Sequence, residues 1–267
     1  MSLDQRSLHL RRMIVEGLEG GNRGHLGTSM SPVEILRVLY DSFLRYRPYD
    51  SKWAERDRFI LSKGHGCLAL YAVLADKGFF PREELKTFCK PTSRLGGHPE
   101  RDKLPGVEAS TGALGHGLSI GVGMAVAAKL KSQPYRVVVI TGDGEIQEGS
   151  VWEAAMCASK HRLDNLTVFV DYNKVQSYGP TKEVLNLEPL LDKWRAFGFA
   201  TTEVDGHDVA ALDAVMKRLP LEADKPTAVI CHTIKGKGFP FAEGKAEWHH
   251  KSSFNSDEIN AMFDCLA

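Results

Sequence analysis

Residues 136–149 have the sequence RVVVITGDGEIQEG. The run RVVVIT over residues 136–141 is almost continuously β-branched and apolar, which is typical of a strand buried on both faces of a parallel sheet. Gly142-Asp143-Gly144 follows at once, and its two glycines allow a sharp turn and leave room for a bulky anion. Asp143 is therefore expected at the carboxyl end of the strand, where open parallel sheets bind ligands.

Strand-like runs alternate with helical segments along the second half of the chain. Further strands are expected at residues 166–171 (LTVFVD), 199–204 (FATTEV) and 227–232 (TAVICH). This order predicts an α/β fold, with a mainly parallel sheet and helices on both faces. No repeat, low-complexity tract or linker interrupts it, so residues 1–267 are expected to form a single domain. Its helical flanks are expected over about residues 1–50 and about 256–265.

Several helices carry start signals in their sequence. Residues 31–34 (SPVE) combine a capping hydroxyl, a proline and an acid, and predict a helix through Leu44. Residues 150–153 (SVWE) repeat the capping box and predict a helix through about Arg162. Pro81, followed by two glutamates, marks another start.

The glycine-rich segment 112–131 is predicted to be a loop leading into a closely packed helix, because small residues allow close backbone approach.

Composition excludes several classes of function. Lys plus Arg equals Asp plus Glu at 34 each, so no net field favours nucleic acid or an anionic membrane as a partner. No segment approaches a membrane span, and the amino terminus lacks the apolar core of a signal peptide. The five cysteines are scattered, without metal or redox spacing, which fits a reducing compartment. A cytoplasmic protein is expected.

A metal site is predicted where two strands end. Asn173 lies thirty positions after Asp143 and ends the next strand, LTVFVDYN. A right-handed strand–helix–strand crossover places both carboxyl ends at one edge of the sheet. Carboxylate, amide and backbone carbonyl oxygens, the last expected from Val175, suit Mg²⁺ bound to phosphate. The start of the helix at Ser150 is expected to add a positive dipole end there. Gly-Asp-Gly alone is a common turn, so only the ordered combination carries this prediction.

The segment from Gly142 to Val175 resembles the thiamine-diphosphate signature of transketolases. Further motifs resemble the active-site motifs of that family in order, over about residues 20–250: RGHLG (23–27), LSKGHG (61–66), GHPE (97–100), STGALG (110–115) and EWHH (247–250). The resemblance implies the thiamine-diphosphate-binding fold, with thiamine diphosphate and Mg²⁺ as cofactors. It implies transfer of a two-carbon ketol unit between a ketose phosphate and an aldose phosphate.

The resemblance also assigns roles to individual residues. It implies that His25, His65, His98 and His249 face the thiazolium and the substrate, with His250 a rival for the place of His249. Histidines suit proton transfer among sugar hydroxyls, although a lone histidine is more often structural.

For the cofactor, the resemblance implies contacts from His65, Gly112, Leu114, Gly115, Gly142, Asp143, Gly144, Glu148 and Asn173. The metal ligands that it implies are Asp143, Asn173 and Val175. Glu148 matches a glutamate that the family uses where its subunits meet, and otherwise it is a solvated acid before a helix. Two departures, Leu26 and His116, bear on the substrate more than on the cofactor.

The family's activating glutamate lies in a pyrimidine-binding domain, for which the 17 residues after His250 leave no room. The sequence resembles the amino-terminal subunit of a split transketolase. The resemblance implies a separate carboxy-terminal subunit that supplies the glutamate, with two copies of each chain.

Two alternatives remain open at this point. One is another thiamine enzyme, such as a 1-deoxyxylulose-phosphate synthase or the α subunit of a 2-oxoacid dehydrogenase. The other is a phosphate-binding subunit that acts only in regulation.

Overall fold

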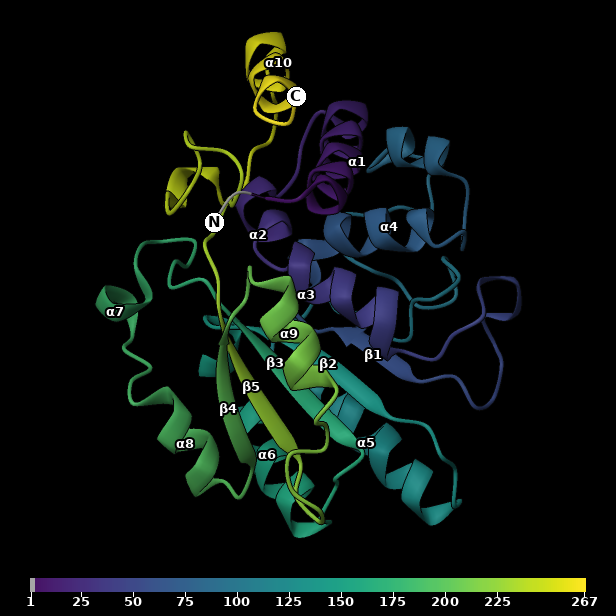
Figure 1. The fold of residues 1–267 in the computed structure, drawn as a ribbon. Helices are drawn as coiled ribbons and strands as arrows, with labels where there is room; N and C mark the ends of the chain where they lie inside the picture. The colour runs from purple at the N-terminus through teal and green to yellow at the C-terminus, as the bar shows by residue number, and fades with distance from the viewer. Residues whose placement is uncertain (1–2) are drawn as a thin grey trace.

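The computed structural model describes residues 3–267. Five strands of this part form one sheet in the order β1-β2-β3-β5-β4, and each neighbouring pair is parallel. The strands are β1 (Arg58–Leu61), β2 (Val137–Gly142), β3 (Leu166–Tyr172), β4 (Ala200–Asp205) and β5 (Thr227–His232). The parallel α/β fold expected from the sequence is confirmed (Figure 1), whereas the division into a single domain stays a prediction.

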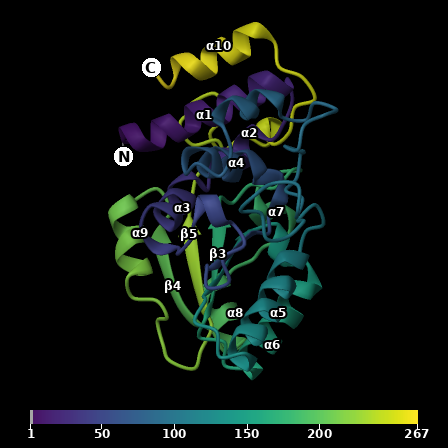
Figure 2. The ribbon, with the colours of Figure 1, turned by 90° about the vertical axis from the view of Figure 1, so that its right-hand side faces the viewer.

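Helices cover both faces of the sheet (Figures 1 and 2). In chain order they are α1 (Gln5–Gly21), α2 (Leu26–Met30), α3 (Val33–Val38), α4 (Cys67–Asp76), α5 (His116–Leu130), α6 (Gly149–Lys160), α7 (Thr181–Val184), α8 (Leu190–Ala196), α9 (Val209–Met216) and α10 (Ser256–Asp264). The helical amino-terminal region and the helix near residues 256–265 are confirmed.

Alternating side chains of β2 separate two hydrophobic cores, because successive residues of a strand point to opposite faces. Val138 and Ile140 join a core with α1, α3, α4 and α9. Val137 and Val139 join a second core with α5, α6 and α8. Every residue of β2 is buried, which explains why its sequence is continuously apolar.

The strand β1 is absent from the sequence prediction. Its four residues, RFIL, are too short to show a period and follow a charged segment. β1 pairs with β2 from Arg58↔Val137 to Leu61↔Ile140, so tertiary pairing makes it a strand.

Both predicted capping boxes are wrong, although both helices exist. The Ser31 hydroxyl donates to Asp171 at 2.6 Å, and the Ser150 hydroxyl donates to the Gly115 carbonyl at 2.9 Å. Long-range acceptors have replaced the local amides. The helix after Ser31 continues beyond α3 as a π-helical turn, Leu39–Phe43. The expected helix after Pro81 is a short 3₁₀ segment, Arg82–Thr87.

The glycine-rich segment behaves as predicted. A loop leads into α5, and Gly121 lies so close to the sheet that a Cβ would come 2.7 Å from the Val139 side chain. No helix of the described residues is long and apolar enough to cross a membrane.

Glu34 belongs to a buried ion pair instead of a cap. Arg11 donates to both Glu34 oxygens, at 2.5 and 3.0 Å, and both side chains are at most 1% exposed. His207 Nδ1 contacts Glu34 Oε2 at 2.8 Å. Burial alone would raise the pKa of Glu34, but hydrogen bonds from His207 and Arg11 lower it to about 2.

The Arg11→Met substitution removes the main partner of a buried carboxylate. We expect it to lower the free energy of unfolding by about 3 kcal/mol, since an uncompensated buried charge is costly. Urea unfolding measures the change. Arg195→Met, which removes an exposed pair with Asp192, is the control and should change stability by less than about 0.5 kcal/mol. Equal effects of the two variants would contradict the assignment.

Candidate active site

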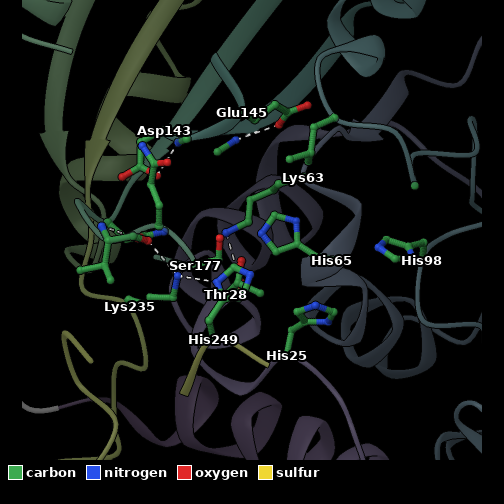
Figure 3. A pocket seen from close by; sticks show the side chains of 17 residues that line it. His25, Thr28, Lys63, His65, His98, Asp143, Glu145, Ser177, Lys235 and His249 are labelled. Carbon is green, nitrogen blue, oxygen red and sulfur yellow. Dashed lines mark hydrogen bonds between the residues drawn. The ribbon is translucent and has the colours of Figure 1, made fainter. Parts of the chain in front are cut away.

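A cavity of about 260 Å³ opens at the carboxyl ends of β2 and β3. It is lined by most of the residues singled out in the sequence: His25, His65, His98, Gly112, Leu114, Gly142, Asp143, Gly144, Asn173, Val175 and His249. Gly115 and Glu148 are not part of the lining and lie against each other beside it. The fold thus brings together residues that are more than 200 positions apart (Figure 3).

Asp143 and the loop after β3 are joined directly. β2 and β3 pair in register up to Gly142↔Asp171, so their tips are neighbours. Asp143 Oδ1 accepts from the Gly144 amide at 2.7 Å, and Oδ2 accepts from the Lys174 amide at 2.5 Å. Asn173 Oδ1 accepts from the Val175 amide at 3.2 Å. The predicted proximity of the two strand tips is confirmed.

The donor set around Asp143 fits a divalent cation. Its side chain is nearly buried, and it forms no ion pair with any of the described residues. Burial, and secondarily the nearby Asp171 carboxylate, raises the pKa of Asp143 to about 6. A metal ion would offset this cost, and carboxylate, amide and carbonyl oxygens are its hard ligands. The described residues hold no cluster of three or more His, Cys, Asp or Glu, as expected of a site with one carboxylate.

The glycines of the Gly-Asp-Gly turn differ from the sequence interpretation. Neither has a positive φ, and Gly144 is in the ordinary helical region at φ −65°. A Cβ on Gly144 would come 3.1 Å from the Gln176 side chain. Gly144 is therefore favoured by space and not by backbone conformation.

Lys63 forms a buried ion pair below the cavity that the sequence analysis did not identify. It contacts Asp171, which lies at the end of β3 and is fully buried. Its Nζ also donates to the Thr28 carbonyl at 3.1 Å. Burial alone would raise the pKa of Asp171, but Lys63 lowers it below its ordinary value.

Lys235 is a second cation that sequence reasoning missed. Its Nζ donates to the Val175 carbonyl at 2.8 Å and lies 2.7 Å from His249 Nδ1. Burial, and secondarily Lys63, lowers the pKa of Lys235 to about 8. Lys235 comes three residues after β5, so applying the strand-tip rule to the fifth strand would have found it.

Four histidines form a cluster on the other side of the cavity (Figure 3). The His25 ring lies 5.6 Å from His65, 6.2 Å from His98 and 5.5 Å from His249, measured between centroids. Burial lowers the pKa of His25 and of His249 to about 3 and also lowers that of His65 and His98. All four are therefore neutral near pH 7, with one nitrogen able to donate and one able to accept a proton.

The structure distinguishes His249 from His250. His249 lines the cavity and contacts Lys235. His250 is exposed and packs on His25 at 4.6 Å, and it does not belong to the lining. His249 thus has the position expected of a site residue.

Glu145 links two motifs that are separate in the sequence. Its buried carboxylate accepts from the Gly142 amide and from the Gly115 amide, each at 3.0 Å, and from the Ser62 hydroxyl. Burial raises the pKa of Glu145. Gly115 has φ 79°, and a Cβ there would come 2.6 Å from Glu148 Cβ, so this position requires glycine.

The start of α6 does not contribute to the cavity as expected. No residue of α6 lines it, and Ser150 instead holds the Gly115 loop. The expected dipole contribution to a phosphate is therefore not supported.

Known proteins share the sequence that builds this site. The family model for the transketolase thiamine diphosphate binding domain matches residues 4–266. One of the two chains of the apulose-4-phosphate transketolase of Actinobacillus succinogenes is 44% identical over 256 residues, which cover 96% of this chain and 92% of that protein. One chain of the 6-deoxy-6-sulfo-D-fructose transketolase of Clostridium sp. (strain MSTE9) is 44% identical over 241 residues, which cover 90% and 88%.

Solved structures agree in fold. The transketolase of Leishmania mexicana superposes with a TM-score of 0.93 at 31% identity. A transketolase of Pichia stipitis gives 0.92 at 32% identity. Each covers all of this chain, and this chain spans 41% of each solved chain.

The fold and the site define the diphosphate-binding part of a thiamine-diphosphate enzyme. The chain belongs to the transketolase family, and it is one subunit of a transferase that depends on thiamine diphosphate. The family, fold and reaction class expected from the sequence are confirmed. The metal ion, the role of each site residue and the stoichiometry stay predictions.

Asp143→Asn tests the electrostatic cost of this site in the metal-free chain. With a pKa near 6, up from 3.8, ionised Asp143 costs about 3 kcal/mol at neutral pH. The asparagine loses part of the hydrogen bonding, so we expect a net stability gain of about 1 kcal/mol.

The sign of this effect depends on pH. Because the folded pKa is raised, the favourable contribution of protonated Asp143 is present below about 4 and is lost as the pH rises through about 6. The advantage of the variant should therefore appear only above that pH. Urea unfolding in EDTA at several pH values measures it, and a variant less stable than wild type at neutral pH would contradict the prediction.

Proposed function

We propose that this chain provides the Mg²⁺–diphosphate site of a two-chain transketolase. The enzyme transfers a two-carbon ketol unit from a ketose phosphate to an aldose phosphate. The observation that carries the proposal is the meeting of Asp143 and the Asn173–Val175 loop in one cavity with the neutral histidine cluster.

The metal site uses three oxygens of this chain. Asp143 would provide a carboxylate oxygen, Asn173 its amide oxygen and Val175 its main-chain carbonyl. Lys63 and Lys235 add positive charge to the same cavity, which suits a diphosphate. We assign Gly142 and Gly144, whose small size leaves space beside Asp143, to the diphosphate contact.

Other contacts are assigned to the thiamine rings. Gly112, Leu114 and Gly115 belong to the loop next to the cavity, and Glu145 holds the Gly115 amide at 3.0 Å. This loop is assigned to the aminopyrimidine. Glu148, exposed beside Gly115, is assigned to the contact between subunits.

Bound thiamine diphosphate supplies a carbon nucleophile for the ketose carbonyl and accepts the electron pair released when the carbon–carbon bond breaks. His25, His65 and His98 would move protons at the sugar hydroxyls and carbonyl oxygen. Neutral imidazoles suit this task because each presents a donor and an acceptor. His249, held by Lys235, would donate to phosphate or substrate.

The substrate class follows from the relatives. Their names specify apulose-4-phosphate in one case and 6-deoxy-6-sulfo-D-fructose in the other. We propose that this chain serves a ketose that carries a terminal anionic group. Screening the reconstituted pair with phosphate and sulfonate ketoses tests this, and turnover of uncharged ketoses alone would contradict it.

A second subunit is proposed to supply the activating glutamate, with two copies of each chain. The relatives are named as subunits. Beside the cavity, Leu114, Ile120 and Met156 are 37%, 37% and 55% exposed. Ile120 and Met156 lie on α5 and α6, which pack together. These three residues form an apolar face that suits the partner. A cytoplasmic location completes the proposal, supported by the free cysteines of the described chain.

Asp143→Ala and Asn173→Ala should each abolish Mg²⁺-dependent binding of thiamine diphosphate. Each removes a metal ligand, so we expect affinity to fall by roughly 100-fold or more, with the partner present. Isothermal titration calorimetry measures it. Asp205→Asn, an exposed aspartate at the tip of β4, is the control.

The outcomes of this titration separate the candidate functions. Binding without ketol transfer would favour a different thiamine enzyme. No cofactor binding in any mixture would leave the regulatory alternative. Appreciable two-carbon transfer by the purified single chain would contradict the need for a partner.

Ile120→Glu and Met156→Glu should weaken association with the partner subunit, because each places a charge in an apolar interface. We expect the dissociation constant to rise by roughly 30-fold or more, measured by analytical ultracentrifugation of the mixed chains. Leu130→Glu is the matched control, since Leu130 is 81% exposed at the other end of α5, about 20 Å away along the helix. Equal weakening by all three variants would contradict this face.

A further inference from the structure

The loop that carries His98 has a flexible sequence. Gly96 and Gly97 precede His98, and two successive glycines leave the backbone almost unrestrained. Pro99 follows and restricts only His98 itself to extended conformations. The direction of the imidazole therefore depends on what holds this backbone from outside.

Helix α4 provides those contacts. The Tyr71 hydroxyl lies 3.0 Å from the Gly96 carbonyl and 3.1 Å from the His98 carbonyl. Cys67 Sγ donates to the Gly97 carbonyl at 3.2 Å. Three consecutive carbonyls of the loop are thus bound by two side chains one helical turn apart. Both are buried, at 1% exposure each.

The same helix begins at the other histidine of the site. The 3₁₀ turn Gly64–Gly66 carries His65 and leads directly into α4 at Cys67. On the far side of the loop, the Thr111 amide donates to the Pro99 carbonyl at 3.3 Å, and His98 packs against Gly112. His98 lies at the side of the cavity away from Asp143 (Figure 3).

We propose that Tyr71, assisted by Cys67, is a positioning residue that sets His98 relative to His65 by binding the carbonyls of the Gly96–His98 loop. The role of His98 toward substrate rests on the proposed function, whereas the anchoring of the loop does not. Tyr71 does not line the cavity, so it acts through His98.

The first experiment measures the loop in the full isolated chain. Trypsin cleaves after Arg94 and Arg101, which flank His98, when the loop opens. Tyr71→Phe keeps the ring and removes both hydrogen bonds, and we expect cleavage at these sites to be roughly five- to tenfold faster. Tyr46→Phe is the matched control, because the Tyr46 hydroxyl donates to the Tyr40 carbonyl at 2.8 Å, away from the loop.

Cys67→Ala is a second variant, which decides the matter if Tyr71→Phe fails to fold, as judged by circular dichroism. It should speed the same cleavages by roughly twofold, since a thiol is a weaker donor. Cleavage rates equal to those of wild type in every folded variant would overturn the anchor. An equal increase in Tyr46→Phe would also overturn it.

The second experiment uses the chain reconstituted with its partner, Mg²⁺ and thiamine diphosphate. Tyr71→Phe should raise KM for the ketose by roughly threefold or more, with a smaller change in kcat. The Kd of the cofactor should stay within about twofold, since the metal ligands are elsewhere. Unchanged KM together with weakened cofactor binding would overturn the positioning role. If the wild-type pair transfers no ketol unit, the proposed function fails, and the cleavage rates still decide the anchor.

Discussion

The ion pair between Lys63 and Asp171 lies directly below the cavity, and the geometry of the site depends on it. Isolated charges at this depth would be strongly destabilising, but this pair is supported by further hydrogen bonds. Asp171 also accepts from Ser31, at the end of α2, and from Thr233, after β5. One carboxylate thereby ties β1, β3, β5 and an amino-terminal helix together at the edge where the ligand site is built.

The charge of Asp171 also determines the character of its neighbours. It adds to the cost of ionising Asp143, while Lys63 and Lys235 lower the cost of bringing an anion into the cavity. The histidines on the other side are kept neutral by burial and by the same lysines. The cavity is thus divided into a charged part for a metal and diphosphate and an uncharged part for proton transfer. This division is what a two-carbon transfer at an anionic cofactor requires.

Stability is given up at this site in favour of binding. A buried carboxylate without a cation, and a lysine whose pKa is lowered by burial, are unfavourable in the free chain. A bound metal diphosphate satisfies both groups. The exposed apolar residues beside the cavity have the same logic, because a partner that covers them excludes water from the reacting groups.

The sequence by itself determined the parallel α/β fold, the metal-binding strand tips and the histidine set. Apolar runs such as residues 136–141 encode burial locally, and motifs such as GDG and GHPE keep their spacing wherever the chain goes. The strand β1 was not predictable, because a four-residue strand depends on its neighbour. The roles of Ser31, Ser150 and Glu34 were also not predictable. Each had a reasonable local partner, and the tertiary structure supplied a stronger distant one.

Only the tertiary structure decided which charged groups meet. Lys63 and Asp171 are 108 positions apart, and Lys235 and Val175 are 60 apart. It also separated His249 from His250, adjacent residues with the same chemistry, through the direction of each side chain. The physical reason is that burial and long-range hydrogen bonds act through space, whereas a sequence pattern records only the neighbours along the chain.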